Sequence, residues 1–98
     1  MKNNILCNLN LKGCESEIKK LKKLSNFYNL FIENQINKII NKVTIFICSA
    51  SMKVDKNFLD KAINLKFIYS PSTGIDHVDL IEAKKKKLKL YILQKKEI

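Results

Sequence analysis

The sequence predicts an α/β fold in which helices cover a sheet of parallel strands. Two mostly apolar runs, Thr44 to Cys48 and Leu65 to Tyr69, have the length and the β-branched or aromatic content of buried strands. Between them, the segment from Asp55 to Ala62 has its apolar residues at helical spacing. Strands that alternate with helices are typical of parallel strands joined by right-handed crossovers. The chain is therefore expected to form such a sheet.

The N-terminal part of the chain begins the same alternation. A first strand is expected around Ile5 to Cys7, and Gly13 interrupts the pattern after it. From Ser16 onward the spacing predicts a helix with one buried apolar stripe and a solvated lysine face. The residues of this stripe are Ile18, Leu21, Leu24 and Tyr28.

A second strand and a second helix are expected next. Leu30 to Ile32 forms a short apolar run of strand character. Ile36, Ile39 and Ile40 then fall on one helical face. Asparagines and β-branched residues in this segment make the helix intrinsically weak, so packing must stabilise it.

The C-terminal elements carry explicit helix signals. Asp55 suits the N-cap of the helix that follows it, and Asp79 with Glu82 three residues later forms a capping-box pattern. Lys84 to Lys87 falls at the C-terminal end of that second helix, where positive charge complements the helix dipole. A last strand is expected from Leu88 to Leu93.

Composition limits the possible functions. The chain has 98 residues, 46% of them hydrophobic, which is enough for one small domain or part of one. Its formal net charge is +10, and all 19 basic residues are lysine. Arginine is the main reader of base edges, so its absence argues against nucleic acid as a partner. A basic, non-catalytic module that binds nucleic acid or another polyanion remains the alternative function.

The cysteines and the apolar runs indicate a cytoplasmic protein without a metal or a membrane span. Cys7, Cys14 and Cys48 are odd in number, and the gap between the first two is too long for a short zinc hook. The only histidine, His77, is far from that pair. Reduced thiols are therefore expected. No apolar run exceeds the length of a strand, and no signal peptide is recognisable.

Two loops are the candidate binding site, because ligands of open parallel sheets bind beyond the carboxyl ends of the strands. One loop runs from Cys48 to Ser51 and the other from Pro71 to Gly74. If their strands are neighbours, hydroxyls and free backbone N–H groups line one crevice that suits a carboxylate. Gly74 allows close approach of the backbone, although a turn with positive φ also explains a glycine there. Ser49 and Ser51 are equally compatible with ordinary loop residues.

The segment from about Val43 to Leu93 resembles the NAD-dependent D-2-hydroxyacid dehydrogenases, the family that includes phosphoglycerate dehydrogenase. The resemblance is carried in order by the strand and loop Ile45 to Ser51, the turn Pro71 to Gly74, and Asp76-His77-Val78-Asp79-Leu80. The first 40 residues match only in outline. The resemblance implies a flavodoxin-like parallel sheet with flanking helices, namely the N-terminal part of the family's substrate-binding domain, incomplete relative to the full domain.

The resemblance also implies roles for particular residues. Substrate-binding residues would be Ser49, Ala50, Ser72, Thr73 and Gly74, with Thr73 also near the nicotinamide of the cofactor. The implied substrate is a small 2-hydroxy or 2-oxo acid, and the implied reaction is hydride transfer. Many phosphoglycerate dehydrogenase-type relatives have a basic residue where this chain has Cys48, which argues against a phosphorylated substrate.

No catalytic residue is expected in this chain. His77, Asp76 and Asp79 are interpreted as structural residues of a turn and a helix cap. The family's catalytic arginine, acidic residue and histidine belong to a later region, and so does the Rossmann domain that holds NAD or NADP. Gly13 and Gly74 are the only glycines and cannot form its glycine-rich phosphate turn.

Residues 1–98 are thus expected to be a substrate-domain fragment whose missing partner is the cofactor domain of the same polypeptide. Such a fragment should neither hold NAD firmly nor transfer hydride. Because a C-terminal segment of the family returns to pack on this domain, an exposed apolar face is also expected. The family usually has glycine where Lys87 stands, so the helix before the last strand either ends differently or places a lysine in left-handed backbone. A receiver-like regulatory domain is a weaker alternative, since Asn8-Leu9-Asn10 follows the first strand instead of acidic residues.

Overall fold

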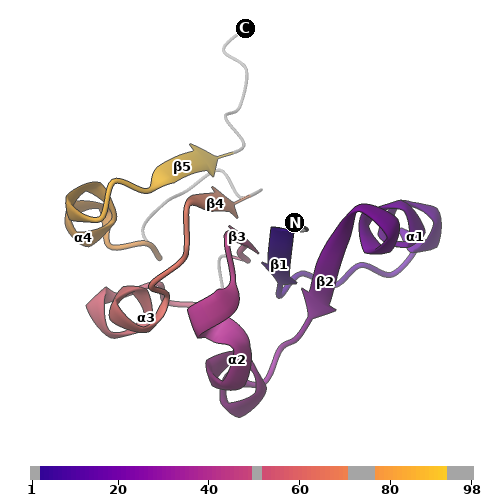
Figure 1. Ribbon diagram of the computed structural model, residues 1–98, viewed down its shortest axis with the longest axis horizontal. Coiled ribbons are helices and arrows are strands. Elements are labelled where there is room, and N and C mark those ends of the chain that lie inside the picture. The colour runs from indigo at the N-terminus through magenta and orange to yellow at the C-terminus, as the bar shows by residue number, and fades with distance from the viewer. Residues whose placement is uncertain (1–2, 50–51, 71–76, 93–98) are drawn as a thin grey trace, which may run out of the picture.

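Five parallel strands form the sheet at the centre of the protein (Figure 1). The computed structural model describes residues 3–49, 52–70 and 77–92. Within these ranges the strand order is β2-β1-β3-β4-β5, and every neighbouring pair is parallel. The predicted α/β class and parallel sheet are confirmed. The strands are β1 (Asn3–Cys7), β2 (Ser25–Asn29), β3 (Ile45–Ile47), β4 (Phe67–Ser70) and β5 (Lys89–Ile92).

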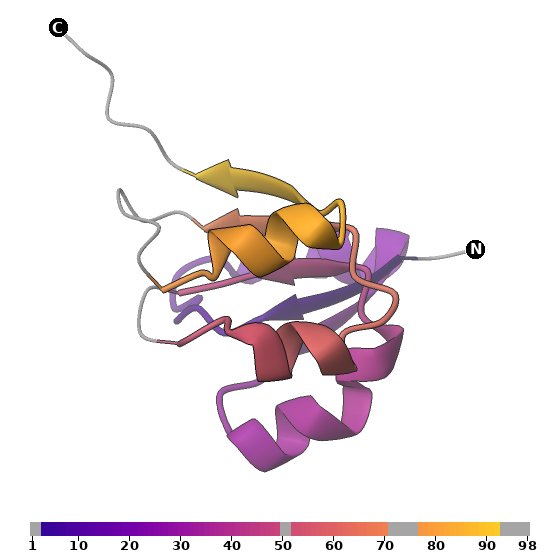
Figure 2. The same cartoon turned by 90° about the vertical axis from the view of Figure 1, so that its left-hand side faces the viewer.

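The helices lie on both faces of the sheet, but unevenly. Figures 1 and 2 show α2, α3 and α4 on one face and α1 on the other, beside β1 and β2. Among the described residues, no helix has both the length and the apolar character needed to cross a bilayer. The helices are α1 (Glu15–Leu24), α2 (Glu33–Ile39), which continues into the 3₁₀ turn η1 (Ile40–Lys42), α3 (Lys56–Lys61) and α4 (Leu80–Lys85).

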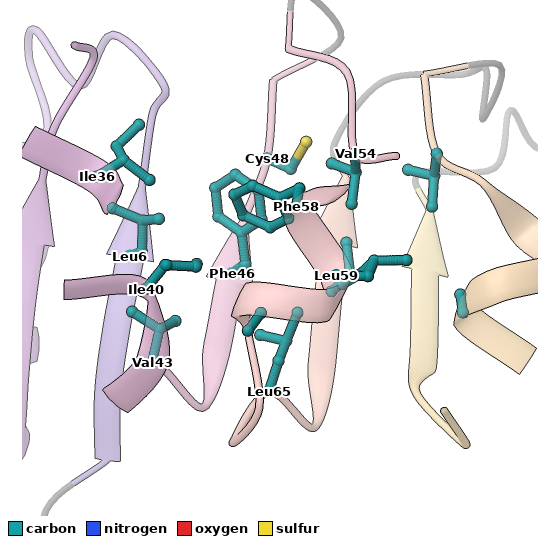
Figure 3. Close-up of a cluster of buried hydrophobic side chains, with 14 residues drawn as sticks. Leu6, Ile36, Ile40, Val43, Phe46, Cys48, Val54, Phe58, Leu59 and Leu65 are labelled. Atoms are coloured by element: carbon teal, nitrogen blue, oxygen red, sulfur yellow. The ribbon is translucent and has the colours of Figure 1, made fainter. Parts of the chain in front are cut away.

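The main hydrophobic core lies between the sheet and the three helices of one face. Leu6, Phe46 and Ile68 point into it from β1, β3 and β4, and all three are fully buried. The ring of Phe58 from α3 packs on Phe46 with 5.2 Å between the ring centroids (Figure 3). Ile36, as predicted, is buried from α2. The core therefore joins strands and helices from most of the chain.

Both predicted acidic caps are present. The side chain of Asp55 accepts a hydrogen bond from the backbone N–H of Phe58 at 3.0 Å, and that of Asp79 accepts one from Glu82 at 3.0 Å. These bonds satisfy N–H groups that have no partner within the first helical turn. The predicted starts of α3 and α4 are thus confirmed.

The second strand is formed by a different segment from the apolar run that was expected to form it. The predicted strand Leu30 to Ile32 is wrong, because β2 is formed by Ser25–Asn29 and directly follows α1. The hydroxyl of Ser25 donates to the carbonyl of Leu21 at 2.7 Å at the end of the helix. Asn29 then donates from Nδ2 to the carbonyl oxygens of Cys7 and Leu9, at 2.9 and 3.1 Å. Side-chain hydrogen bonds to the neighbouring β1 therefore hold this strand in place, rather than apolar periodicity.

The predicted buried stripe of the first helix is also wrong. None of the residues of α1 is buried, and Leu24 is 76% exposed. Tyr28, which was expected to extend the helical stripe, belongs to β2 and packs against the core from the sheet. Ile18 and Leu21 are only half-buried, so the apolar side of the helix, which lies beside β1 and β2, is partly covered.

The end of α4 places Lys87 in left-handed backbone, with φ of 57°. The N–H of Lys87 bonds the carbonyl of Lys84 at 3.0 Å, and the N–H of Leu88 bonds the carbonyl of Ala83 at 3.0 Å. This pair of bonds is the Schellman motif, whose left-handed position usually holds glycine. The sequence left open whether the helix ends differently or Lys87 takes left-handed backbone, and the structure has the second arrangement.

We expect Lys87→Gly to stabilise the fold. A residue with a Cβ in left-handed backbone is disfavoured by about 1 kcal/mol, and the greater unfolded-state freedom of glycine offsets part of that gain. The expected net increase is about 0.5 kcal/mol in the free energy of unfolding, measured by urea denaturation. Lys85→Gly, within α4, should instead destabilise by up to about 1 kcal/mol. Equal losses in both variants would contradict the assignment of strain to Lys87.

The second face of the sheet is only partly covered. Ile5 and Cys7 of β1 are buried on the face where α1 lies. Across β3, β4 and β5 the same face carries the partly buried Ile45, Ile47 and Phe67, and beside them Tyr69 is 38% exposed and Tyr91 is 51% exposed. The rings of Phe67 and Tyr91 stack with 6.2 Å between centroids. The sequence-based expectation of an exposed apolar face is met here, and we call these five residues the open face.

Candidate functional site

The two candidate loops leave neighbouring strands at the same edge of the sheet. Ile47 of β3 and Tyr69 of β4 are register partners. The N–H of Cys48 continues the ladder by donating to the carbonyl of Tyr69 at 2.8 Å. Because both strands run in the same direction, the chain segments that follow them leave together. The prediction that the two loops start side by side is confirmed.

Of the five predicted substrate-binding residues, the structure describes Ser49. Ala50, Ser72, Thr73 and Gly74 lie outside the described residues, so their roles stay predictions, including that of Thr73 toward the cofactor. The N–H of Ser49 donates to the Oδ1 atom of Asn8 at 2.7 Å. The N–H of Ser49 is therefore occupied within the protein, and the predicted role of Ser49 in substrate binding stays a prediction.

Asn8 is a site residue that the sequence-based reasoning did not identify. It follows β1, which lies next to β3, and its side chain reaches both Ser49 and the next segment of that loop. Its Nδ2 atom contacts the sulfur of Met52 at 3.3 Å. The signal was present, because Asn8 is the first polar residue after a strand, where the rule for open sheets places ligands. Asn8 therefore sets the position of the loop that begins at Cys48.

A short bridge joins the segments that follow the two loops. Val54 and Val78 pair as an isolated parallel bridge. The N–H of Val54 donates to the carbonyl of His77 at 2.7 Å, and the N–H of Asp79 donates to the carbonyl of Val54 at 2.8 Å. The described segments that flank residues 50–51 and 71–76 are thus joined to each other before these residues, at β3 and β4, and after them, at Val54 and Val78.

His77 contacts the end of the strand that precedes the second loop. Its Nε2 atom lies 3.0 Å from the hydroxyl oxygen of Ser70, which is fully buried at the end of β4. Ser70 and His77 flank residues 71–76, so this hydrogen bond fixes the separation of the two ends of the predicted carboxylate-binding loop. The imidazole is half-buried.

Cys48 contributes no charge to the site. Burial raises the pKa of its thiol to about 12, and its Sγ atom donates to the carbonyl of Ser49 at 3.2 Å. Burial also raises the pKa of Cys7, against a smaller lowering by a hydrogen bond with the backbone of Leu9. Both side chains are therefore neutral thiols at physiological pH. Cys7, Cys14 and Cys48 are all free of disulfides.

Neither a cluster of metal-ligating side chains nor a glycine-rich phosphate turn is found within the described residues. No group of three His, Cys, Asp or Glu side chains within residues 3–49, 52–70 and 77–92 could hold a metal ion. Gly13 precedes α1 with φ of 90°, but a Cβ added there would meet nothing within 4 Å. A phosphate cradle needs several closely spaced glycines whose backbone approaches the ligand. The turn between β1 and α1 lacks this construction.

The chain is similar to the family described as D-isomer specific 2-hydroxyacid dehydrogenase, catalytic domain, whose model matches residues 5–93. No curated protein matches it in sequence. Among solved structures, a protein from Pyrococcus horikoshii OT3 is 26% identical over 94% of the chain, with a TM-score of 0.79.

Two further structures share the fold. D-lactate dehydrogenase from Aquifex aeolicus, complexed with NAD and lactic acid, is 24% identical over 92% of the chain with a TM-score of 0.78. NAD-dependent formate dehydrogenase from Staphylococcus aureus, in complex with NAD, is 21% identical over 91% of the chain with a TM-score of 0.79. The chain spans only 28%, 27% and 32% of the lengths of these three proteins, in the order given.

Proposed function

Because this chain belongs to the D-isomer specific 2-hydroxyacid dehydrogenase family, whose catalytic-domain model matches residues 5–93, we propose that it is the substrate-binding part of an oxidoreductase that interconverts small D-2-hydroxy acids and 2-oxo acids. The observation that supports this most is the pairing of β3 with β4, which starts both candidate loops at one edge of the sheet. A small acid held between these loops would contact both.

The proposed contacts divide between the two loops. The backbone N–H groups of Thr73 and Gly74 hold the substrate carboxylate, because an anion is bound well by several converging N–H donors. Ser49 and Ala50 border the rest of the substrate, and Ser72 completes the second loop. The neutral thiol of Cys48 beneath them offers no positive charge, so an unphosphorylated acid is the proposed substrate.

The residues of this chain bind and orient the acid but do not oxidise it. His77 contacts Ser70 and Asp79 caps α4, which supports structural roles for both residues rather than proton exchange with the substrate. NAD or NADP accepts the hydride when it is bound. It would be held by a separate cofactor domain, with Thr73 facing the nicotinamide. We propose that residues 1–98 alone neither hold NAD firmly nor catalyse the reaction. The free cysteines agree with a cytoplasmic location.

Titration of the isotopically labelled chain with pyruvate, followed by amide NMR, tests this proposal. We expect the shifts to concentrate at Ser49 and at residues 72–77, and Gly74→Ala to weaken binding about tenfold, the effect of losing roughly one charge-assisted hydrogen bond. Lys20→Ala is the control, because Lys20 is exposed on α1 and lies in neither loop. Shifts confined to other regions, or equal weakening in both variants, would refute the location of the substrate site. Oxidation of D-lactate by the isolated chain with NAD would refute its proposed inactivity.

A further inference from the structure

A second hollow lies at the same edge of the sheet, next to the proposed substrate loops. Its volume is about 540 Å³, within the range of small-molecule pockets. Asn8, Phe31 and Met52 line it from the segments that follow β1, β2 and β3, and α2 and α3 form its sides. The strand order places the reversal of winding between β1 and β3, which is where open α/β sheets usually bind ligands. We call this hollow the switch-point cavity.

The lining of the switch-point cavity is mixed, with four apolar residues among seven polar or charged ones, and the cavity is partly open to water. Ile36 and Phe58 belong both to this lining and to the buried core, and Figure 3 shows them over β1 and β3. Phe31 also borders the cavity, yet its side chain is 60% exposed. Covering an exposed phenyl ring is favourable by on the order of 25 cal/mol for each Å² of apolar surface. The cavity therefore favours a ligand with an apolar group that covers Phe31.

Charges of both signs belong to the same lining. Glu33 and Asp55 contribute carboxylates, and Lys53 and Lys61 contribute ammonium groups. Within the described part of the chain, Glu33, Lys53 and Lys61 form no ion pair, whereas Lys56 and Asp60 on the same helix as Lys61 pair at 2.7 Å. The charges at the cavity balance, so a ligand that carries one charge of each sign is matched better than a dianion.

We propose that the switch-point cavity binds a hydrophobic α-amino acid in its zwitterionic form. The apolar side chain lies against Phe31, Ile36 and Phe58, the ammonium group pairs with Glu33, and the carboxylate pairs with Lys53 or Lys61. Asp55 contributes its negative charge while one of its oxygens caps α3. This site differs from the proposed substrate site, which lies toward β4.

Asn8 connects the two sites. Its side chain lines the switch-point cavity and at the same time accepts the N–H of Ser49 at 2.7 Å. A ligand that moves the Asn8 amide would therefore change the position of Ser49. For this reason, shifts at Ser49 alone do not distinguish the two sites, and the reporters of the cavity must be Phe31, Asn37 and Lys61.

Amide NMR titration of the full 98-residue chain with L-phenylalanine tests the proposal. We expect saturable shifts at Phe31, Asn37 and Lys61 with a dissociation constant on the order of millimolar, as is usual for so small a ligand. 3-Phenylpropanoate lacks the ammonium group and 2-phenylethylamine lacks the carboxylate, so each should bind at least about fivefold more weakly. Pyruvate should leave these three amides unshifted.

Variants of exposed residues separate binding from folding. Phe31→Ala and Lys61→Gln should each weaken L-phenylalanine binding by about fivefold or more while the rest of the spectrum is unchanged. Ile63→Ala and Lys22→Gln are the matched controls, because both residues are exposed and neither lines the cavity. No saturable shift, equal binding of the three phenyl compounds, or equal effects of test and control variants would each overturn the proposal.

Discussion

Replacing Phe46 with alanine is expected to remove most of the stability of the fold and bring the chain close to its unfolding midpoint at room temperature. Phe46 is fully buried at the centre of the sheet, where its ring packs on Phe58. Removing a buried phenyl ring typically destabilises by about 3–5 kcal/mol, through lost transfer free energy and the cavity left behind. Small domains have total stabilities of only about 5–15 kcal/mol, and a sheet with one partly open face belongs at the low end of this range.

Urea denaturation followed by far-ultraviolet circular dichroism measures this effect. Phe46→Leu keeps most of the buried volume and should cost only about 1–1.5 kcal/mol. Phe67→Ala provides a comparison on the open face, where the phenylalanine is only partly buried, and it should destabilise less than Phe46→Ala. Equal midpoints for the two alanine variants would show that the core does not lie where the structure places it.

The wild-type chain is expected to self-associate through its open face. Parallel sheets are normally covered on both faces, and here Tyr69, Tyr91 and Phe67 remain accessible over β4 and β5. Introducing lysines at both tyrosines, Tyr69→Lys with Tyr91→Lys, should weaken association at least tenfold by placing charge in the contact. Sedimentation velocity over a range of protein concentrations measures the change.

Salt provides a second test of the same association. Each copy has a formal net charge of +10, so electrostatic repulsion opposes pairing, and screening that repulsion should strengthen it. Binding to a polyanion would respond in the opposite direction, because salt weakens it. Ile81→Lys is the matched control, since Ile81 is 71% exposed on α4, on the other face of the sheet. A monomer at all salt concentrations, or equal effects of the control and the double variant, would contradict this expectation.

The parts of the fold that could be predicted from the sequence are those with short-range causes. The strands near Ile45 and Phe67 appear as continuous apolar runs, and the starts of α3 and α4 are marked by Asp55 and Asp79, which act on N–H groups three residues away. The predicted adjacency of β3 and β4 also holds, because a crossover helix usually returns the chain to a neighbouring parallel strand. The family resemblance of residues 43–93 rested on the same region.

The failures came where distant contacts outweigh local pattern. Leu30 to Ile32 is more apolar than Ser25–Asn29, yet the latter forms β2, because its backbone and its asparagine side chains pair with β1. Asn26 and Asn4, which join across this pair, are 22 residues apart in sequence. Of the apolar residues left over, Phe31 borders the switch-point cavity and Leu30 packs against the core.

The sequence by itself determined the fold class, the helix caps, the neutral character of the loop at Cys48 and the family, because these depend on residues within a few positions of one another or on a motif read in order. Only the tertiary structure decided that Asn8 occupies the N–H of Ser49 across 41 residues, that Lys87 takes left-handed backbone, and that α1 leaves half of one sheet face uncovered. The physical reason is that long-range hydrogen-bond partners and burial exist only in the folded chain. Periodicity and capping, in contrast, involve residues that are close in sequence.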